Sequence, residues 1–147
     1  MKMLVVALAL VLAVAVTGCS NGTVAEPVEP VVVELLVRGA LPPLDEAFVV
    51  GHAVRVKDSG AVIGTITDVE VEPALMAVPD ATGSLQAARS PVFLDIWLTI
   101  EGEASVSDAG YRFDGTNVYM NSDVEYLTPV TFFSGTIMSM KPVDAGQ

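Results

Sequence analysis

The segment from Val54 to Pro73 reads Val-Arg-Val-Lys-Asp-Ser-Gly-Ala-Val-Ile-Gly-Thr-Ile-Thr-Asp-Val-Glu-Val-Glu-Pro, and it decides how we expect the chain to fold. Apolar and polar residues alternate on both sides of Asp58-Ser59-Gly60, which is typical of a tight turn between two antiparallel strands. The segment therefore predicts a β-hairpin with strands at 53–57 and 62–72. Because proline cannot donate a backbone hydrogen bond, we expect Pro73 to interrupt the pairing.

A second version of part of this pattern lies near the C-terminus. Gly64-Thr65-Ile66 in the hairpin resembles Gly135-Thr136-Ile137, and in both segments the glycine is typical of a bulge or a bend within a strand. The strands that end at Gly39 and Gly102 are related in a similar way. Two interpretations stay open, namely a barrel built from two related halves and a coincidence between two glycine-bent strands.

The rest of the chain is predicted to be almost entirely strand. Alternation is clearest at 92–101, where every second residue is Leu or Ile. Residues 41–48 can hold one helical turn, and the polar, glycine-containing segment 80–91 predicts an exposed loop. We therefore expect an all-β domain, either a small barrel or a barrel-like sandwich. The other strand-like segments are 31–38, 111–113, 117–121, 124–127 and 131–141.

The N-terminus has the features of a bacterial lipoprotein signal peptide. Met1-Lys2-Met3 gives a positive start, and Leu4–Val16 is an uncharged apolar run, shorter than the roughly 20 residues of a bilayer span. Val16-Thr17-Gly18-Cys19 resembles a lipobox, in which an aliphatic residue and two small residues precede cysteine. We therefore expect cleavage after Gly18 and attachment of diacylglycerol and a further acyl chain such as palmitate to Cys19. An uncleaved signal anchor and an ordinary core cysteine are the alternatives.

These features divide the chain into four parts. A signal peptide at 1–18 precedes a flexible tether at 19–30, which is rich in Pro, Glu, Gly and Ala and has no apolar periodicity. The β domain is expected at 31–141, and 142–147 is expected to be a disordered tail. The domain would then lie outside the cytoplasm, held to the bacterial membrane by the lipid on Cys19.

The charge of the chain excludes several classes of partner. Its 147 residues include 18 acidic and 7 basic side chains, which give a formal net charge of −11. Such a chain is not expected to bind nucleic acid or to dock directly on anionic lipid headgroups. Cys19 is the only cysteine and His52 the only histidine, so neither an internal disulfide nor a metal site built on Cys and His is expected. No cofactor-binding motif is present, and we expect no cofactor.

Three acidic residues form the main candidate binding face. Asp68, Glu70 and Glu72 alternate along one predicted strand, so their side chains are expected on the same face. That face could bind calcium or hold a cationic partner, although no calcium-loop motif accompanies it. A solvated face that protects a strand edge is the alternative. His52 is the only candidate base for nucleophilic catalysis, but no nucleophile-elbow motif accompanies it, so no catalytic residue is assigned.

Several blocks of the sequence resemble a bacterial family called domain of unknown function 4330. The most specific blocks are Ile63–Pro73 and Asp95–Gly102, supported by Leu36–Gly39 and Phe133–Ile137, and the resemblance covers roughly Val31 to Met140. The resemblance implies that the domain lies outside the membrane. Members of the family usually have an N-terminal membrane helix, and in this chain a lipobox takes its place. The resemblance implies no activity and no catalytic residues. A weaker likeness to the mammalian-cell-entry domain, a β-barrel of lipid-transport systems, supports a barrel.

We therefore expect a non-enzymatic binding or assembly module of the bacterial cell envelope, with an envelope protein or glycan as its partner. One alternative is a barrel that handles lipid or polysaccharide during transport, and a continuous apolar lumen would favour it. Another is a hydrolase of envelope glycans, which two carboxylates facing each other across a cleft would favour. A filled core beside an exposed strand edge would favour the interaction module.

Overall fold

The fold is that of a computed structural model, which describes residues 27–143. Within these residues the chain forms eight strands and one short 3-10 helix, η1, at Leu44–Ala47. All strand pairings are antiparallel. The strands are β1 (Val28–Ala40), β2 (Ala53–Val56), β3 (Val62–Pro79), β4 (Leu85–Ser107), β5 (Gly110–Phe113), β6 (Thr116–Val118), β7 (Asp123–Leu127) and β8 (Phe132–Pro142).

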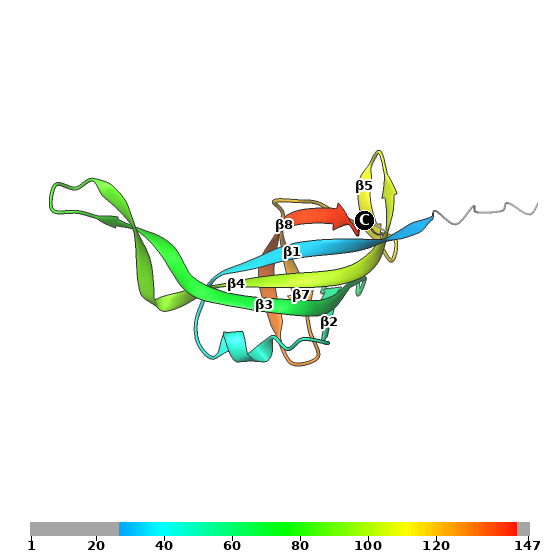
Figure 1. The fold of residues 1–147 in the computed structure, drawn as a ribbon, viewed down its shortest axis with the longest axis horizontal. Coiled ribbons are helices and arrows are strands. Elements are labelled where there is room, and N and C mark those ends of the chain that lie inside the picture. Colours follow the sequence, from blue (N-terminus) through cyan, green and yellow to red (C-terminus); the bar gives the residue numbers. More distant parts are fainter. Residues whose placement is uncertain (1–26, 144–147) are drawn as a thin grey trace, which may run out of the picture.

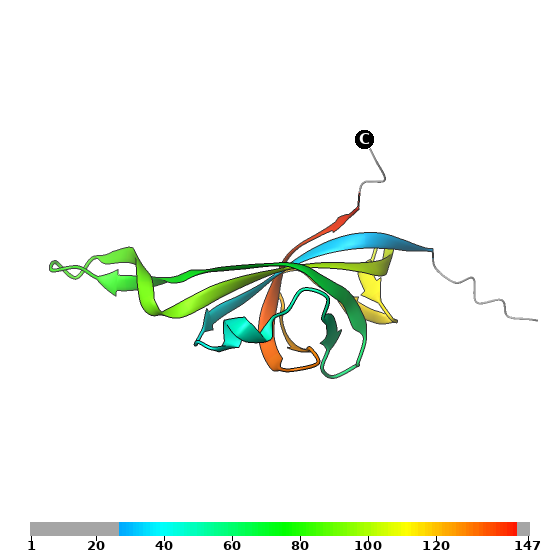
Figure 2. The ribbon, with the colours of Figure 1, turned by 60° about the horizontal axis from the view of Figure 1, so that its bottom comes forward.

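The sheet closes on itself to form a barrel-like ring. Its strand order is β1-β8-β7-β2-β3-β4-β5-β6, and β1 also pairs with β4, so six of the strands complete a circuit. The β5–β6 hairpin continues from the end of β4, outside this circuit. Figures 1 and 2 show the closed part at the centre of the molecule, with the distal parts of β3 and β4 extending far to one side. The prediction of an all-β, barrel-like domain is confirmed.

The ring has the pairing pattern of two related halves. Exchanging β1 with β4, β2 with β7, and β3 with β8 leaves the order of strands around the ring unchanged. The β1–β4 pairing is centred on Glu34 opposite Thr99. These two residues become equivalent under the exchange, because Glu34 pairs with Ser139 of β8 and Thr99 pairs with Asp68 of β3. The Gly-Thr-Ile triplets lie in β3 and β8, and Ile66 and Ile137 are both fully buried. The topology therefore agrees with the repeat that these triplets predict.

Large side chains fill the interior of the ring. Tyr126 and Phe113 are fully buried, and Phe48, which follows η1, packs edge-on against Phe133 with 4.8 Å between ring centroids. Burial of so much apolar surface is the main source of stability for a domain of this size. Other fully buried side chains are Leu35, Ile63, Ile66, Ile96, Leu98, Ile100, Ile137, Val31, Val33 and Val54.

The prediction of a loop at 80–91 is wrong. Residues from Leu85 onward belong to β4, and only the turn at 80–84 separates β4 from β3. The expectation that Pro73 interrupts the pairing is correct to within one residue. Pro73 itself lies opposite Leu94, the register shifts directly after it, and β3 then continues to Pro79. The loop prediction failed because the end of β3 and the start of β4 stabilise each other as a hairpin, and neither segment shows strong alternation alone.

The N-terminal boundary also differs from the prediction. β1 begins at Val28, within the tether predicted at 19–30, because Val28 and the residues after it pair with the end of β4. Pro142, predicted to begin the tail, is the last residue of β8. The signal peptide at 1–18, Cys19 and residues 144–147 lie outside the described residues. Within 27–143, no helix has the length and hydropathy needed to cross a bilayer.

Burial of Tyr126 makes a prediction about stability at high pH. Its hydroxyl has no hydrogen-bond partner among the described residues, and burial raises its pKa from 10.0 to about 12. Because the pKa of Tyr126 is higher in the folded state than in the unfolded state, the protonated hydroxyl favours the folded state. Its contribution to the free energy of unfolding is fully present below pH 10 and is lost as the pH rises toward 12. Tyr126→Phe should match or exceed the wild type in stability at pH 7, by up to about 2 kcal/mol, because it removes an unpaired buried hydroxyl.

Urea denaturation at pH 7, 10 and 11.5 measures this effect. The variant should lose less stability than the wild type above pH 10. Tyr119→Phe is the matched control, because Tyr119 is exposed and its loss should leave the high-pH decline unchanged. A parallel decline in Tyr126→Phe and the wild type would contradict the prediction.

Candidate functional site

The most unusual surface of the molecule is the hairpin that β3 and β4 form beyond the ring. We call Leu75–Arg89 the arm. Its two strands pair only with each other, from Leu75 opposite Arg89 to Pro79 opposite Leu85. Figures 1 and 2 show the arm projecting from one end of the molecule, with the start of β1 at the other end. No third strand among the described residues pairs with either strand of the arm.

The arm exposes large apolar side chains and carries almost no charge. Leu75 is 65% exposed and Leu85 is 72% exposed, and Met76 and Val78 are also exposed. Between Leu75 and Ala88 the only ionisable side chain is that of Asp80, in a chain whose net charge is −11. Contiguous exposed apolar surface of this kind marks interaction sites in soluble proteins.

A polar turn closes the tip of the arm. One carboxylate oxygen of Asp80, Oδ1, accepts hydrogen bonds from the backbone N–H of Thr82 at 2.8 Å, the Thr82 hydroxyl at 2.7 Å and the N–H of Ser84 at 3.0 Å. The side-chain amide of Gln86 donates to the other oxygen at 2.9 Å. Hydrogen bonds, above all from the Thr82 hydroxyl, lower the pKa of Asp80. The tip is therefore ordered by its own hydrogen bonds and carries a charged carboxylate.

A large bulge in β4 joins the arm to the ring. Four residues of β4, from Ser90 to Phe93, lie opposite the single residue Ala74 of β3. The hydroxyl oxygen of Ser90 is buried and accepts hydrogen bonds from the backbone N–H groups of Val92, at 3.1 Å, and Phe93, at 2.8 Å. Bulges bend the strand that contains them and change its direction. This bulge therefore sets the angle at which the arm leaves the ring.

The predicted acidic face meets the base of the arm. Asp68, Glu70 and Glu72 are all exposed on β3, opposite Thr99, Trp97 and Asp95 respectively, so the prediction that they share a face is confirmed. Together with Val71, the last two acids and Trp97 line a shallow hollow. Within residues 27–143, no three acidic, histidine or cysteine side chains gather closely enough to hold a metal ion.

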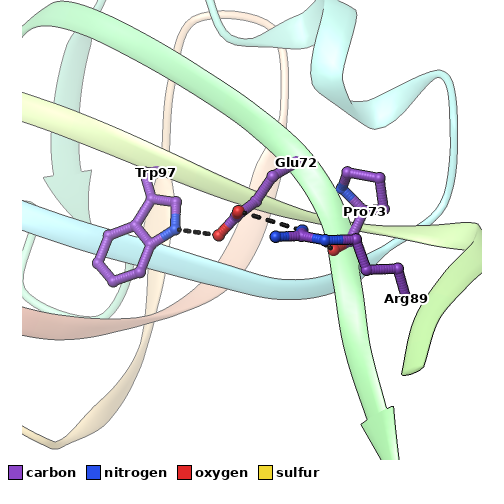
Figure 3. Close-up of polar contacts among 4 residues, drawn as sticks. All are labelled: Glu72, Pro73, Arg89 and Trp97. Carbon is purple, nitrogen blue, oxygen red and sulfur yellow. Dashed lines mark hydrogen bonds and ion pairs between the residues drawn. The ribbon is translucent and has the colours of Figure 1, made fainter. Parts of the chain in front are cut away.

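Glu72 connects the ring to the arm (Figure 3). One oxygen of its carboxylate accepts a hydrogen bond from the indole N–H of Trp97 at 3.2 Å, and the other forms an ion pair with Arg89 at 3.4 Å. The Arg89 guanidinium also donates to the carbonyl oxygen of Pro73 at 3.2 Å. We call Glu72, Arg89 and Trp97 the latch. It fixes an arm residue, Arg89, against two residues of the ring.

A groove also lies at the base of the arm. Arg38 and Gly39 at the end of β1 form one wall, and Leu75, Met76 and Phe93 form the apolar part of the lining. The Asp95 carboxylate accepts a hydrogen bond from the backbone N–H of Gly39 at 2.9 Å, which holds the end of β1 beside β4. The exposed apolar surface of the arm therefore continues into the body of the domain.

The family model described as domain of unknown function (DUF4330) matches residues 1–141. The chain belongs to the DUF4330 family. The match confirms the resemblance seen in the blocks Ile63–Pro73 and Asp95–Gly102, and it also includes the N-terminal apolar segment, which the resemblance left out. Searches of curated proteins and of solved structures returned no match.

Within residues 27–143 of the DUF4330 chain, no hydrogen bond joins a nucleophilic side chain to the ring of His52. His52 lies just before β2, where its backbone N–H donates to the carbonyl oxygen of Val49 and its carbonyl oxygen accepts from Ile66. Its Nδ1 atom is buried and has no hydrogen-bond partner among the described residues. The geometry gives no arrangement of base and nucleophile at this position.

Sequence reasoning missed the arm of the DUF4330 domain, which it interpreted as a polar loop. A usable signal was present, because Leu75–Pro79 and Leu85–Ala88 are two uncharged, mainly apolar segments on either side of a turn sequence, Asp-Ala-Thr-Gly-Ser. Short apolar segments around such a turn are typical of a hairpin. The latch could not be predicted, because its members come from parts of two strands whose register is set by the bulge.

The latch predicts a selective change in the fluorescence of Trp97, the only tryptophan in the chain. Glu72→Ala removes the acceptor of its indole N–H and should shift its emission, while Glu72→Gln retains an acceptor and should shift it less. Both variants should lose no more than about 1 kcal/mol of stability, because the ion pair is exposed. Asp68→Ala is the control on the same face. An emission shift in Asp68→Ala as large as that in Glu72→Ala would contradict the latch.

Proposed function

We propose that this protein is a lipid-anchored, extracytoplasmic binding module of the bacterial cell envelope, without catalytic activity, that uses its arm to hold a protein partner. The observation that carries this proposal is the arm, which projects beyond the ring and carries Leu85 and Leu75, the two most exposed large apolar side chains of the described residues. Partially apolar surfaces with free strand edges recognise other proteins by packing and by strand addition.

The position of the arm suits an anchored protein. The start of β1, at Val28, lies at the end of the molecule opposite the arm (Figure 1). Cys19 is only a short segment upstream of Val28, and we propose that it carries the lipid. An anchor at that end would direct the arm away from the membrane, toward partners in the envelope.

The filled interior argues against the lipid-transport alternative. Fully buried side chains such as Tyr126, Phe113 and Leu35 occupy the space that a lipid would need. The hydrolase alternative also lacks support. Glu70 and Glu72 are neighbours on one face of the same strand, not partners across a cleft, and Glu72 is engaged by Trp97 and Arg89. A glycosidase instead places its two carboxylates on opposite sides of the scissile bond.

The anchoring part of the proposal predicts the behaviour of Cys19→Ala. Without the thiol no lipid can be attached, so most of the mature chain should leave the membrane fraction or accumulate as the uncleaved precursor. Fractionation of cells followed by mass spectrometry of the product distinguishes these forms. Ser20→Ala is the neighbouring control and should stay lipidated and membrane-bound. Full membrane retention of Cys19→Ala with normal processing would show that the anchor is not this cysteine.

The binding part is tested by photo-crosslinking in the native envelope. A benzophenone side chain is placed at Leu85 on the arm or at Val130 in the turn before β8, two exposed apolar positions. Irradiation should give a discrete protein adduct from position 85 and little from position 130. Absence of an adduct at 85, or equal adducts at both positions, would contradict the proposed role of the arm.

A further inference from the structure

One edge of β3 is unpaired along the middle of the strand. β2 pairs with β3 only over Val62–Thr65, and the last backbone hydrogen bonds on that side join Ile66 to Gly51 and His52. From Thr67 to Pro73, which we call the open edge, β4 is the only strand among residues 27–143 that pairs with β3. A segment of this length spans about 20 Å. Such an edge presents backbone N–H and C=O groups to which another strand can add.

One row of side chains on the open edge is acidic. It consists of Asp68, Glu70 and Glu72, all of them exposed on the same face of the sheet. Like charges directly opposite each other destabilise a strand pair. Two copies of this edge paired about Glu70 would place Glu70 opposite Glu70 and Asp68 opposite Glu72. The row therefore disfavours a second copy of the chain and favours a strand that has basic side chains on this face.

The other row of side chains is apolar and incompletely covered. Val69 packs against the core, and it lies opposite the buried Leu98 of β4. Val71 is 45% exposed, although Ile96, the residue opposite it on β4, is fully buried. The cover over the core layer therefore stops at Val71. A strand added to the open edge would bury more of this side chain if its residues on that face were apolar.

Two of the three carboxylates are available to a cationic side chain. Glu72 is held by Arg89 and Trp97 in the latch (Figure 3), but within residues 27–143 no ion pair involves Asp68 or Glu70. Glu70 lies directly opposite Trp97, and both line the shallow hollow beside Glu72. A basic side chain that faces Glu70 would enter this hollow, where the indole ring of Trp97 also attracts cations.

From these observations we infer that the open edge binds an extended basic segment of a partner protein, which adds to β3 as a further strand. Lys or Arg residues of that segment alternate with apolar residues, so the cations face the acidic row and the apolar side chains cover Val71. Backbone hydrogen bonds to β3 supply affinity, and the two rows of side chains supply selectivity. The site lies on the ring, so the inference goes beyond the role proposed for the arm and does not depend on it.

Other occupants fit the open edge less well. Within residues 27–143, no three acidic, histidine or cysteine side chains gather closely enough to hold a metal ion. An acidic segment would be repelled both by the row and by a chain whose net charge is −11. A small amine could pair with one carboxylate, but it would leave Val71 and the backbone groups of the edge uncovered. A strand that is basic on one face and apolar on the other satisfies all of these groups together.

The fluorescence of Trp97 measures binding in the full chain, purified in a neutral detergent. The probe is a capped peptide, Lys-Val-Lys-Val-Lys-Val-Lys, which should change the emission of Trp97 and saturate. Its fully N-methylated form keeps the charge and the side chains but cannot donate backbone hydrogen bonds, so it should bind at least about tenfold more weakly. A Glu-Val-Glu-Val-Glu-Val-Glu peptide should not bind, because its charge is that of the row.

Charge reversals in the protein provide the second test. Glu70→Lys reverses a charge on the open edge and should weaken binding of the Lys-Val peptide by about tenfold. Glu101→Lys is the matched control, because Glu101 is exposed on the same face of β4, which lies between β3 and β1 and has no open edge there. This control should change the affinity by no more than about twofold. Thermal unfolding should show that both variants are folded.

Three outcomes would overturn the inference. Equal binding of the Lys-Val peptide and its N-methylated form would show charge attraction without strand addition. Loss of affinity in Glu101→Lys as large as that in Glu70→Lys would show that the open edge is not the site. Absence of binding of the Lys-Val peptide would show that the acidic row only protects the edge. The role of the arm is tested separately, by the photo-adducts from Leu85, so either proposal can fail without the other.

Discussion

Gly102→Ala is expected to abolish the cooperative folding of the domain. Gly102 on β4 and Gly64 on β3 lie where the two strands approach most closely. A Cβ atom at Gly102 would lie far closer to the Ile63 carbonyl oxygen than the 3.0 Å that real Cβ contacts respect. The atom it meets belongs to the backbone, so the strands would have to separate and lose their pairing. We expect a loss of at least about 4 kcal/mol, most of the stability of a small domain.

Gly64→Ala should have a similar effect, since a Cβ atom there would collide with the Glu101 carbonyl oxygen. Gly135→Ala is the control. Its added Cβ atom would lie 2.5 Å from Cδ2 of Leu35, the end of a side chain that can shift, so we expect a smaller loss of about 1–3 kcal/mol. Thermal unfolding followed by circular dichroism gives the comparison. A Gly102→Ala domain that melts within a few degrees of the wild type would contradict the close approach.

Leu35→Ala and Leu98→Ala are expected to destabilise the domain strongly and to similar extents. The two leucines lie opposite each other in the β1–β4 pairing, and both are buried, with exposures of 0% and 1%. Removing a buried leucine side chain costs about 2–5 kcal/mol, depending on how far the cavity collapses. The two losses should be comparable because the same side chain is removed from two almost equally buried positions.

Leu75→Ala is the matched control for this pair. It makes the same substitution on the arm, where the side chain is 65% exposed, so the change in stability should be within about 0.5 kcal/mol. Urea denaturation measures the free energy of unfolding of all three variants, with one common slope of that free energy against urea concentration. A loss at Leu75 as large as that at Leu98 would show that the arm belongs to the cooperative core, and it would undermine the arm as a free binding surface.

Much of the ring could be predicted from sequence because local rules agree with the tertiary structure there. The predicted core face of the strand at 92–101 is buried at Ile96, Leu98 and Ile100. Asp58-Ser59-Gly60 joins β2 and β3 as expected, and the helical turn predicted at 41–48 is present as η1. In the strand the spacing of apolar side chains matches the period of two, and at the turn Gly60 has the positive φ that glycine tolerates. The family match agrees with the same blocks.

The acidic face illustrates the limit of such reasoning. The alternation of Asp68, Glu70 and Glu72 was sufficient to place them together on β3, and they are together. The contacts of Glu72 depend on β4, because the register of that strand places Trp97 and Arg89 within reach of its carboxylate. Pairing across strands far apart in the chain is not encoded in the period of either strand.

The sequence by itself determined most strands of the ring, the turn at Asp58-Ser59-Gly60, the glycine-bent repeats and the membership in the DUF4330 family. Only the tertiary structure decided which apolar residues stay uncovered. Leu98 and Leu75 look alike in sequence, but Leu98 is enclosed by the ring, while Leu75 lies where β3 and β4 have passed beyond it. An apolar side chain is buried only if another layer packs on it, and the closure of the ring at β1 and β4 fixes where that layer ends.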